Sequence, residues 1–260
     1  MTASQTSPSP ARVIITGADS TARVIAETFL SDGHAVSVCD VRQEAVEDIS
    51  AANPSIFAQT ANMGVEAQVM GFMAAAIEAM GGVDFLVNVV GIAGPTKPTE
   101  EITSDEWAQS MAVNATGPFL ACKAVIPHLK EQRFGGIVNF SSASTRTRLP
   151  NRTPYVVSKY AVEGLTLNLA RELGPFNVRA NAILPGGINN ARLQTIVQKV
   201  AEQNNTTIEA VADDFLKYVS MQTLIEPAEL ADMVAFLCSD KAIHITGQLM
   251  AVDGNVEWEY

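Results

Sequence analysis

The sequence has 260 residues and a formal net charge of −11, with 47% hydrophobic and 17% charged residues. A chain of this length can bury one large core, and no change of composition marks an internal boundary, so we expect one domain over residues 11–260. The negative charge argues against nucleic-acid and anionic-membrane partners, because both carry negative charge themselves.

The first ten residues are polar and lack the positive and apolar regions of a signal peptide. We therefore expect residues 1–10 to form a flexible tail. The longest apolar candidate, residues 83–93, is interrupted by Asn88 and Gly91, so it falls short of a membrane span of roughly 18 residues. These features favour a soluble, cytoplasmic protein that does not enter a membrane.

The three cysteines, Cys39, Cys122 and Cys238, are widely scattered and form no C-x-x-C pair. Such spacing is typical of buried, reduced thiols in a cytosolic protein. The three histidines show no ligand spacing either, so we expect no metal site.

Apolar runs with strand character alternate along the chain with segments of helical period. The predicted strands are residues 13–15, 36–38, 56–58, 85–87, 137–140, 178–183 and 249–252. Helical period lies between them, for example at Ile25, Ala26 and Phe29. Strands that alternate with helices favour right-handed crossovers, so the sequence predicts a single-domain, doubly wound parallel α/β sheet of the Rossmann type.

Tyr155 and Lys159 lie one helical turn apart in the segment SASTRTRLPNRTPYVVSK, residues 142–159. Their side chains would lie over one face of a helix, where the ammonium stabilises phenolate and lowers the pKa of the phenol toward the range useful for proton transfer. Ser142 follows a predicted strand, at the edge where open α/β sheets hold ligands. A lone Tyr-x-x-x-Lys pair is more often a solvated helix face, so the flanking motifs decide its meaning.

This segment, together with the glycine-bearing amino end and the turn at Pro185 and Gly186, resembles the short-chain dehydrogenase/reductase family of the classical type. The likeness covers nearly the whole chain from about Val13 onward. The resemblance implies a catalytic tetrad formed by Asn114, Ser142, Tyr155 and Lys159.

The segment TGADSTAR, residues 16–23, stands where that family has Gly-x-x-x-Gly-x-Gly. Only Gly17 is kept, the loop is one residue short, and Ala22 falls where the last glycine packs helix on strand. Ser20 and Thr21 must then allow the backbone to approach the pyrophosphate of a dinucleotide. Either this loop still binds the cofactor with altered affinity or the cofactor site is lost, and the intact catalytic residues favour the first.

Asp40 follows the second predicted strand, about twenty residues after Gly17, where a carboxylate accepts hydrogen bonds from the adenosine ribose. This carboxylate would repel a 2′-phosphate, so we expect NAD in preference to NADP. Arg42, two residues later, is a caution against this preference, because an arginine can bind a 2′-phosphate. An arginine on the surface at a helix start is the commoner explanation.

The resemblance implies further cofactor contacts, including the amide of Asn62 where an aspartate beside the adenine is usual and the backbone of Ile188 at the nicotinamide. The full cofactor set is Gly17, Ser20, Thr21, Ala22, Asp40, Asn62, Met63, Asn88, Gly91, Tyr155, Lys159, Pro185, Gly186 and Ile188. It also implies a mobile substrate lid around residues 189–220 and assembly as a homotetramer.

The sequence thus predicts an NAD-dependent oxidoreductase that interconverts a secondary alcohol and a ketone. In the expected mechanism Tyr155 takes the alcohol proton, Lys159 lowers the pKa of that tyrosine and holds the ribose, Ser142 binds the reacting oxygen, and Asn114 anchors a water. The alternative is a non-enzymatic dinucleotide-binding regulatory protein, favoured by the eroded glycine motif.

Several arginines lie in the segments that the family uses as substrate walls: Arg146, Arg148, Arg152 and Arg192. With Ser142 and Tyr155, we name Arg148, Arg152 and Arg192 as candidate substrate contacts for an anionic or polyhydroxylated small molecule. Pairing of these arginines with neighbouring acidic residues is the competing interpretation. Arg152 is the best single candidate, since it stands at the entrance of the helix that carries Tyr155.

Overall fold

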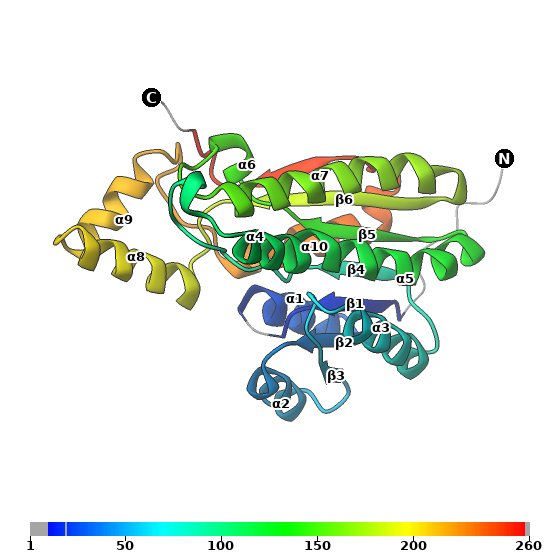
Figure 1. Cartoon of the computed structure of the whole chain (residues 1–260). Coiled ribbons are helices and arrows are strands. Elements are labelled where there is room, and N and C mark those ends of the chain that lie inside the picture. Colours follow the sequence, from blue (N-terminus) through cyan, green and yellow to red (C-terminus); the bar gives the residue numbers. More distant parts are fainter. Residues whose placement is uncertain (1–9, 19, 258–260) are drawn as a thin grey trace.

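Parallel strands form one sheet in the order β3-β2-β1-β4-β5-β6-β7 within the described residues (Figure 1). The strands are β1 (Arg12–Thr16), β2 (Ala35–Asp40), β3 (Phe57–Thr60), β4 (Phe85–Asn88), β5 (Gly135–Phe140), β6 (Val178–Pro185) and β7 (Leu249–Val252). Each overlaps a predicted strand, and every pairing is parallel. The predicted single-domain, doubly wound sheet is therefore confirmed.

The computed structural model describes residues 10–18 and 20–257. Most of the predicted tail, residues 1–9, lies outside the described residues, as do Asp19 and residues 258–260. The side chains of Arg192, Lys199 and Gln203 are also outside the described set.

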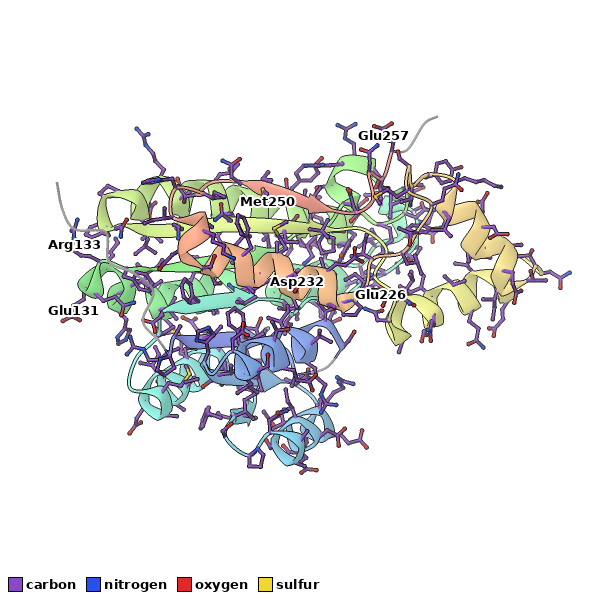
Figure 2. The ribbon with its side chains drawn as sticks, turned by 180° about the vertical axis from the view of Figure 1, so that it is seen from behind. Glu131, Arg133, Glu226, Asp232, Met250 and Glu257 are labelled. Carbon is purple, nitrogen blue, oxygen red and sulfur yellow. The ribbon has the colours of Figure 1, made fainter. Side chains whose placement is uncertain are left out.

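Helices cover both faces of the sheet. They are α1 (Ser20–Ser31), α2 (Gln43–Ala52), α3 (Glu66–Met80), α4 (Ser104–Met111), α5 (Gly117–Gln132), α6 (Ser144–Thr147), α7 (Thr153–Leu173), α8 (Ala191–Gln203), α9 (Ile208–Leu216) and α10 (Pro227–Cys238). One core cluster joins the sheet to α1, α2 and α10, and a second joins it to α3, α5 and α7. Figure 2, seen from behind, shows α10, marked by Asp232, on the face opposite to α5 and α7.

The register of α1 agrees with the helical period of the sequence, because Ile25, Ala26 and Phe29 are all buried. Helix α1 begins at Ser20, soon after β1 ends at Thr16, so the turn between them is short. At the carboxyl ends of the strands, α8 and α9 project beyond the sheet (Figure 1) and occupy most of the segment predicted as a substrate lid. That they move as a lid stays a prediction.

The strand order reverses between β1 and β4, since β2 and β3 extend from one side of β1 and β4 to β7 from the other. At such a switch point the loops that leave the carboxyl ends of adjacent strands diverge to opposite faces and leave a crevice. The topology thus fixes where a ligand can bind before any side chain is considered.

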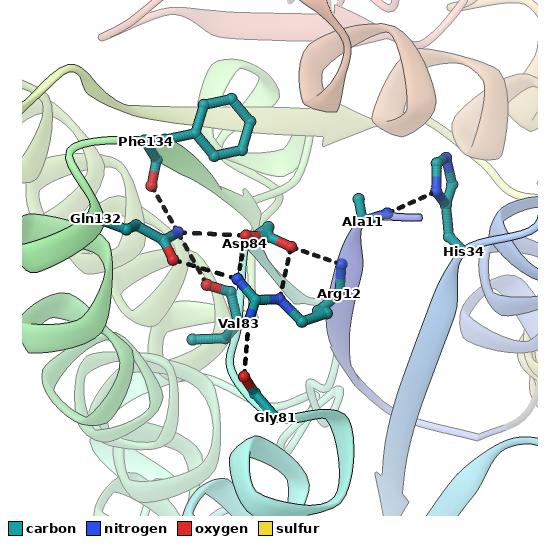
Figure 3. Close-up of polar contacts among 8 residues, drawn as sticks. All are labelled: Ala11, Arg12, His34, Gly81, Val83, Asp84, Gln132 and Phe134. Atoms are coloured by element: carbon teal, nitrogen blue, oxygen red, sulfur yellow. Dashed lines mark hydrogen bonds and ion pairs between the residues drawn. The ribbon is translucent and has the colours of Figure 1, made fainter. Parts of the chain in front are cut away.

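An ion pair ties β1 to β4 at their amino ends, away from that crevice (Figure 3). Asp84, which is almost fully buried, accepts hydrogen bonds from the backbone N–H of Arg12 at 2.8 Å and from its guanidinium at 2.7 and 2.9 Å. Gln132 at the end of α5 donates to the carbonyls of Val83 and Phe134. The hydrogen bond with Asp84 is also the main cause that raises the pKa of Arg12 above its usual value.

The cysteines Cys39, Cys122 and Cys238 are free and buried, as the sequence predicts. Burial raises the pKa of each thiol to about 12, so all three stay protonated and unreactive at neutral pH. Among the described helices, none combines the length and the apolar character needed to cross a membrane.

Candidate active site

A cleft of about 940 Å³ opens at the carboxyl ends of the strands, where the topology places a binding crevice. Most predicted site residues line it: Gly17, Ser20, Thr21, Ala22, Asp40, Asn62, Met63, Gly91, Ser142, Arg152, Tyr155, Lys159, Pro185, Gly186 and Ile188. Among the predicted residues whose side chains are described, Asn88, Asn114 and Arg148 lie outside this lining. No group of three or more His, Cys, Asp or Glu within residues 10–18 and 20–257 is placed to hold a metal ion.

Tyr155 and Lys159 reach the cleft from the first turns of α7. Pro154 lies in the first turn of this helix, where proline favours helix initiation. Lys159 is 4% exposed, and its Nζ donates to the carbonyl of Phe140 at the end of β5, at 2.7 Å. The same Nζ lies 5.8 Å from the centre of the Tyr155 ring. The predicted placement of an ammonium beside the phenol is therefore present.

Ser142 lies directly after β5 and lines the cleft. Its Oγ is 2.6 Å from the Oγ of Ser144 and accepts a hydrogen bond from the Ser144 N–H. This local turn fixes the hydroxyl at the strand end without enclosing it, since the residue keeps partial exposure.

A buried carboxylate behind Ser142 was missed by sequence reasoning. Glu163, one turn beyond Lys159 on α7, accepts hydrogen bonds from Ser141 Oγ and Thr145 Oγ1, both at 2.7 Å. These contacts hold the segment on either side of Ser142 against the helix that carries Tyr155 and Lys159. The only signal in the sequence is an acidic residue at i+4 from Lys159, which is also typical of a solvated face.

Asn114 is fully buried in a π-helical turn (Ala112–Thr116) between α4 and α5, and such turns are frequent at functional sites. Its side chain bonds to both the N–H and the carbonyl of Ile92 and donates to Ser158 Oγ. A Cβ on Gly91 would lie 3.2 Å from Lys159 Nζ and 3.4 Å from Asn114 Oδ1, so these two groups meet at the Gly91 backbone. Asn114 thus lies beside Lys159, behind the cleft wall rather than in it.

The turn at Gly17 keeps the close packing of helix on strand that a dinucleotide turn requires. Gly17 has φ +106°, and a Cβ there would come within 2.9 Å of Ala22 Cβ, which is the close packing expected for a dinucleotide turn. Ser20 also adopts a left-handed φ of +46°, a conformation that a glycine would take at lower cost. Ser20, Thr21 and Ala22, in the first turn of α1, line the cleft with backbone N–H groups that have no partner within the helix. These residues fit a dinucleotide pyrophosphate.

Asp40 ends β2 and lines the same end of the cleft. Its Oδ2 accepts from the Ala18 N–H at 3.2 Å, and its Oδ1 accepts from the backbone and the Nε of Arg42 at 2.9 and 3.3 Å. The carboxylate is therefore held in place from two loops. Arg42, which the sequence offers as a candidate contact for a 2′-phosphate, forms an ion pair with Asp40.

Two predicted cofactor contacts differ from expectation in what their side chains do. Asn88 is 2% exposed and donates to Asn139 Oδ1 at 2.9 Å, so it lies in the core of the sheet and not in the cleft. Asn62 lines the cleft, but its Oδ1 accepts from the Gly64 N–H, which stabilises the turn after β3. The side chain of Asn88 therefore pairs across to a neighbouring strand, as buried polar groups do, and a cofactor contact of this residue stays a prediction.

The predicted arginines separate into different environments. Arg148 is exposed and outside the lining, at the left-handed residue that ends α6, and Arg146 is exposed as well. The side chain of Arg192 is not among those described. Arg152 does line the cleft: its Nη2 donates to the carbonyl of Ala93 at 3.0 Å, and its guanidinium carbon lies 4.9 Å from the centre of the Tyr155 ring.

Beyond Tyr155 the wall of the cleft is largely apolar, which sequence reasoning did not anticipate. Five half-buried hydrophobic residues from four segments contribute to it: Leu149, Leu193, Ile196, Phe215 and Val256. Phe215 of α9 packs on the backbone of Gly187, where a Cβ would be 2.7 Å from its ring. No periodic pattern links these positions, so they gather only when the chain folds.

Comparison with known proteins groups the chain with oxidoreductases. The family model described as enoyl-(acyl carrier protein) reductase matches residues 16–256. Levodione reductase of Leifsonia aquatica is 31% identical over 255 residues, which are 95% of this chain and 94% of that protein. A crystal structure of levodione reductase has a TM-score of 0.89 at 30% identity, covering 94% of this chain and 96% of its own.

Two further solved structures differ in the cofactor that they hold. NAD⁺-bound xylitol dehydrogenase has a TM-score of 0.87 at 28% identity, covering 94% of this chain and 98% of its own. An actinorhodin polyketide ketoreductase variant with NADPH has a TM-score of 0.88 at 26% identity, covering 95% and 98%. The likeness supports binding of a nicotinamide dinucleotide without choosing between the two forms.

Proposed function

Because the chain belongs to the short-chain dehydrogenase/reductase family, we propose that it interconverts a secondary alcohol and a ketone with NAD as the cofactor. The observation that carries this proposal is the arrangement of Ser142, Tyr155 and Lys159 in one cleft, which continues to Asp40 and the turn at Gly17. This cleft unites a proton acceptor with a site that fits a dinucleotide.

In the proposed mechanism the bound nicotinamide supplies the hydride acceptor or donor. Tyr155 Oη takes the proton of the alcohol in the oxidation direction, and the ammonium of Lys159 favours the phenolate that accepts it. Ser142 Oγ donates a hydrogen bond to the reacting oxygen. Lys159 would also hold the ribose of the cofactor, and Asn114, which lies beside Lys159 behind the cleft wall, would anchor a water that relays the proton toward solvent.

The preference for NAD is supported by the fixed position of Asp40. A carboxylate at this site accepts hydrogen bonds from ribose hydroxyls and repels a 2′-phosphate. We expect the kcat/KM ratio of NAD to NADP to exceed one, and Asp40→Ser to lower that ratio by about tenfold, the effect of about 1.4 kcal/mol of differential binding.

The double variant Asp40→Ser/Arg42→Gln is the control for this experiment. In the single variant Arg42 loses its ion pair with Asp40 while its positive charge stays beside the ribose end of the cleft, so part of the change can arise from attraction of the 2′-phosphate by Arg42 rather than from relief of repulsion. Equal kcat/KM for both cofactors in the unaltered protein would contradict the proposal.

The apolar wall supports a substrate whose carbon skeleton is mainly nonpolar, with the carbinol or carbonyl carbon near Ser142 and Tyr155. An anionic or polyhydroxylated substrate is the second candidate, and within the described lining it depends on Arg152. A series of ketones of similar size, one neutral and apolar, one carboxylated and one polyhydroxylated, distinguishes them. We expect the highest kcat/KM for the neutral ketone.

Leu149→Asn tests whether the wall itself makes this selection. It places an amide among apolar side chains, so it should lower kcat/KM for the apolar ketone by about tenfold. The polyhydroxylated ketone should lose less. A carboxylated ketone that is preferred by the unaltered protein would favour the second candidate.

Assembly as a homotetramer stays a proposal. It is supported by large apolar side chains that remain exposed on the outer helices, including Phe119 of α5 at 48% and Leu167 of α7 at 46%. Side chains of this kind often mark contact surfaces between subunits when they gather on one face.

A further inference from the structure

Arg152 is held in a defined place above the ring of Tyr155. It directly precedes α7 and makes no capping hydrogen bond with its side chain. Instead its Nη2 donates to the carbonyl of Ala93, in the loop after β4, at 3.0 Å. The guanidinium carbon then lies 4.9 Å from the centre of the Tyr155 ring, within the range of a cation–π contact.

The tyrosine is thus flanked by two cations, since Lys159 Nζ lies 5.8 Å from the same ring centre. A phenolate carries a full negative charge that is spread over the ring, so a cation above its face is attracted more strongly than by the neutral phenol. We propose that Arg152 is a positioning residue that stabilises the phenolate form of Tyr155 together with Lys159. The inference rests on the proposed function only for its catalytic consequence, because the ionisation of Tyr155 is a property of the protein alone.

Charged groups on the neighbouring segments have partners of their own. Lys97, in the loop after β4, pairs with Glu106 of α4 at 2.8 Å. Glu163 of α7 accepts from Ser141 and Thr145.

The arginines of the segment after β5, Arg146 and Arg148, are exposed and outside the lining, and the Asp40–Arg42 pair lies at the end of β2, beyond β1 and β4 in the sheet. Within the described lining, Arg152 and Lys159 are therefore the cations at the catalytic end.

This placement distinguishes two roles for Arg152. A guanidinium that clamps an anionic substrate affects chiefly the KM of that substrate. A guanidinium that stabilises phenolate changes the pH at which Tyr155 ionises, whatever the charge of the substrate. In the second case its removal makes ionisation harder, so the midpoint rises.

The test is a titration of tyrosinate absorbance in the cofactor-free protein, with Tyr155→Phe as the reference that subtracts the other tyrosines. Arg152→Gln should raise the midpoint of Tyr155 by about one pH unit, the lower end of the effect of a charge within about 6 Å. Arg152→Lys keeps the charge and should show about half of that rise or less. Arg146→Gln removes an exposed arginine nearby and should leave the midpoint unchanged.

Kinetics give the second readout. The acid limb of kcat for oxidation of a neutral alcohol should move to higher pH by the same amount in Arg152→Gln, with KM almost unchanged. An unmoved midpoint in Arg152→Gln, or an equal rise in Arg146→Gln, would overturn the inference, as would a selective KM increase for anionic substrates without any change in the midpoint. If Arg152→Gln fails to fold, Arg152→Met decides the question by the same titration. If no alcohol is oxidised, the titration still decides it, while the proposed function fails separately.

Discussion

Replacing Tyr155 by phenylalanine should lower kcat by about a thousandfold or more, since a general acid–base group typically contributes about a hundredfold to ten-thousandfold. The variant removes one hydroxyl from a cleft open to solvent, so neither the packing of α7 nor the binding of NAD should change appreciably. Lys159 keeps its hydrogen bond to the carbonyl of Phe140 in this variant. The measurements are single-turnover kinetics, circular dichroism and calorimetric titration with NAD.

Tyr160→Phe is the matched control, because it removes a hydroxyl from the next tyrosine on the same helix. The hydroxyl of Tyr160 donates to the carbonyl of Thr145, and its loss should cost activity far less. Turnover of Tyr155→Phe within a few-fold of the unaltered protein would remove Tyr155 from the mechanism.

Replacing Asp84 by alanine should lower the free energy of unfolding by about 1.5–3 kcal/mol, the range for losing hydrogen bonds to a charged group, because Asp84 is buried while the Arg12 side chain stays 28% exposed. Asp84 is 1% exposed, and its loss leaves the Arg12 guanidinium and the Arg12 backbone N–H without their carboxylate. The cluster lies at the amino ends of β1 and β4, so the catalytic cleft should keep its geometry in the protein that remains folded. Urea unfolding followed by circular dichroism measures the change.

Asp214→Ala is the matched control for this experiment. Asp214 pairs with Lys217 on the surface, where both side chains are about two-thirds exposed, at 66% and 68%. Such pairs contribute little, so the expected change is below about 1 kcal/mol. Similar losses for Asp84→Ala and Asp214→Ala would show that the amino-terminal ion pair does not stabilise the sheet.

The fold was predictable because its signals are local. Each strand of the sheet is an apolar run between helical segments, and the buried positions of α1 follow the period that the sequence shows at Ile25, Ala26 and Phe29. The placement of Tyr155 beside Lys159 was predictable for the same reason, since the two residues are one helical turn apart and need no tertiary contact to lie together.

The remaining site features depend on contacts between distant segments. Asn88 resembles a cleft residue in sequence, yet β4 and β5 pair it with Asn139 inside the sheet. Arg148 and Arg152 are equally basic and close in sequence, but the left-handed backbone of Arg148 places it at the end of α6, outside the cleft, while Ala93 draws Arg152 over Tyr155.

The apolar wall and the Glu163 network likewise join segments that no short window of sequence connects. The sequence gives the residues at these positions, but it does not predict which distant residues they contact.

The most direct test of the proposed activity is formation of reduced nicotinamide, followed by its absorbance, when the pure protein is mixed with NAD and a series of secondary alcohols. The account predicts NADH formation with at least one neutral, mainly apolar alcohol, calorimetric binding of NAD, and loss of turnover in Tyr155→Phe. No detectable NAD binding together with no oxidoreductase activity toward any alcohol or ketone would contradict it and would favour the non-enzymatic regulatory alternative.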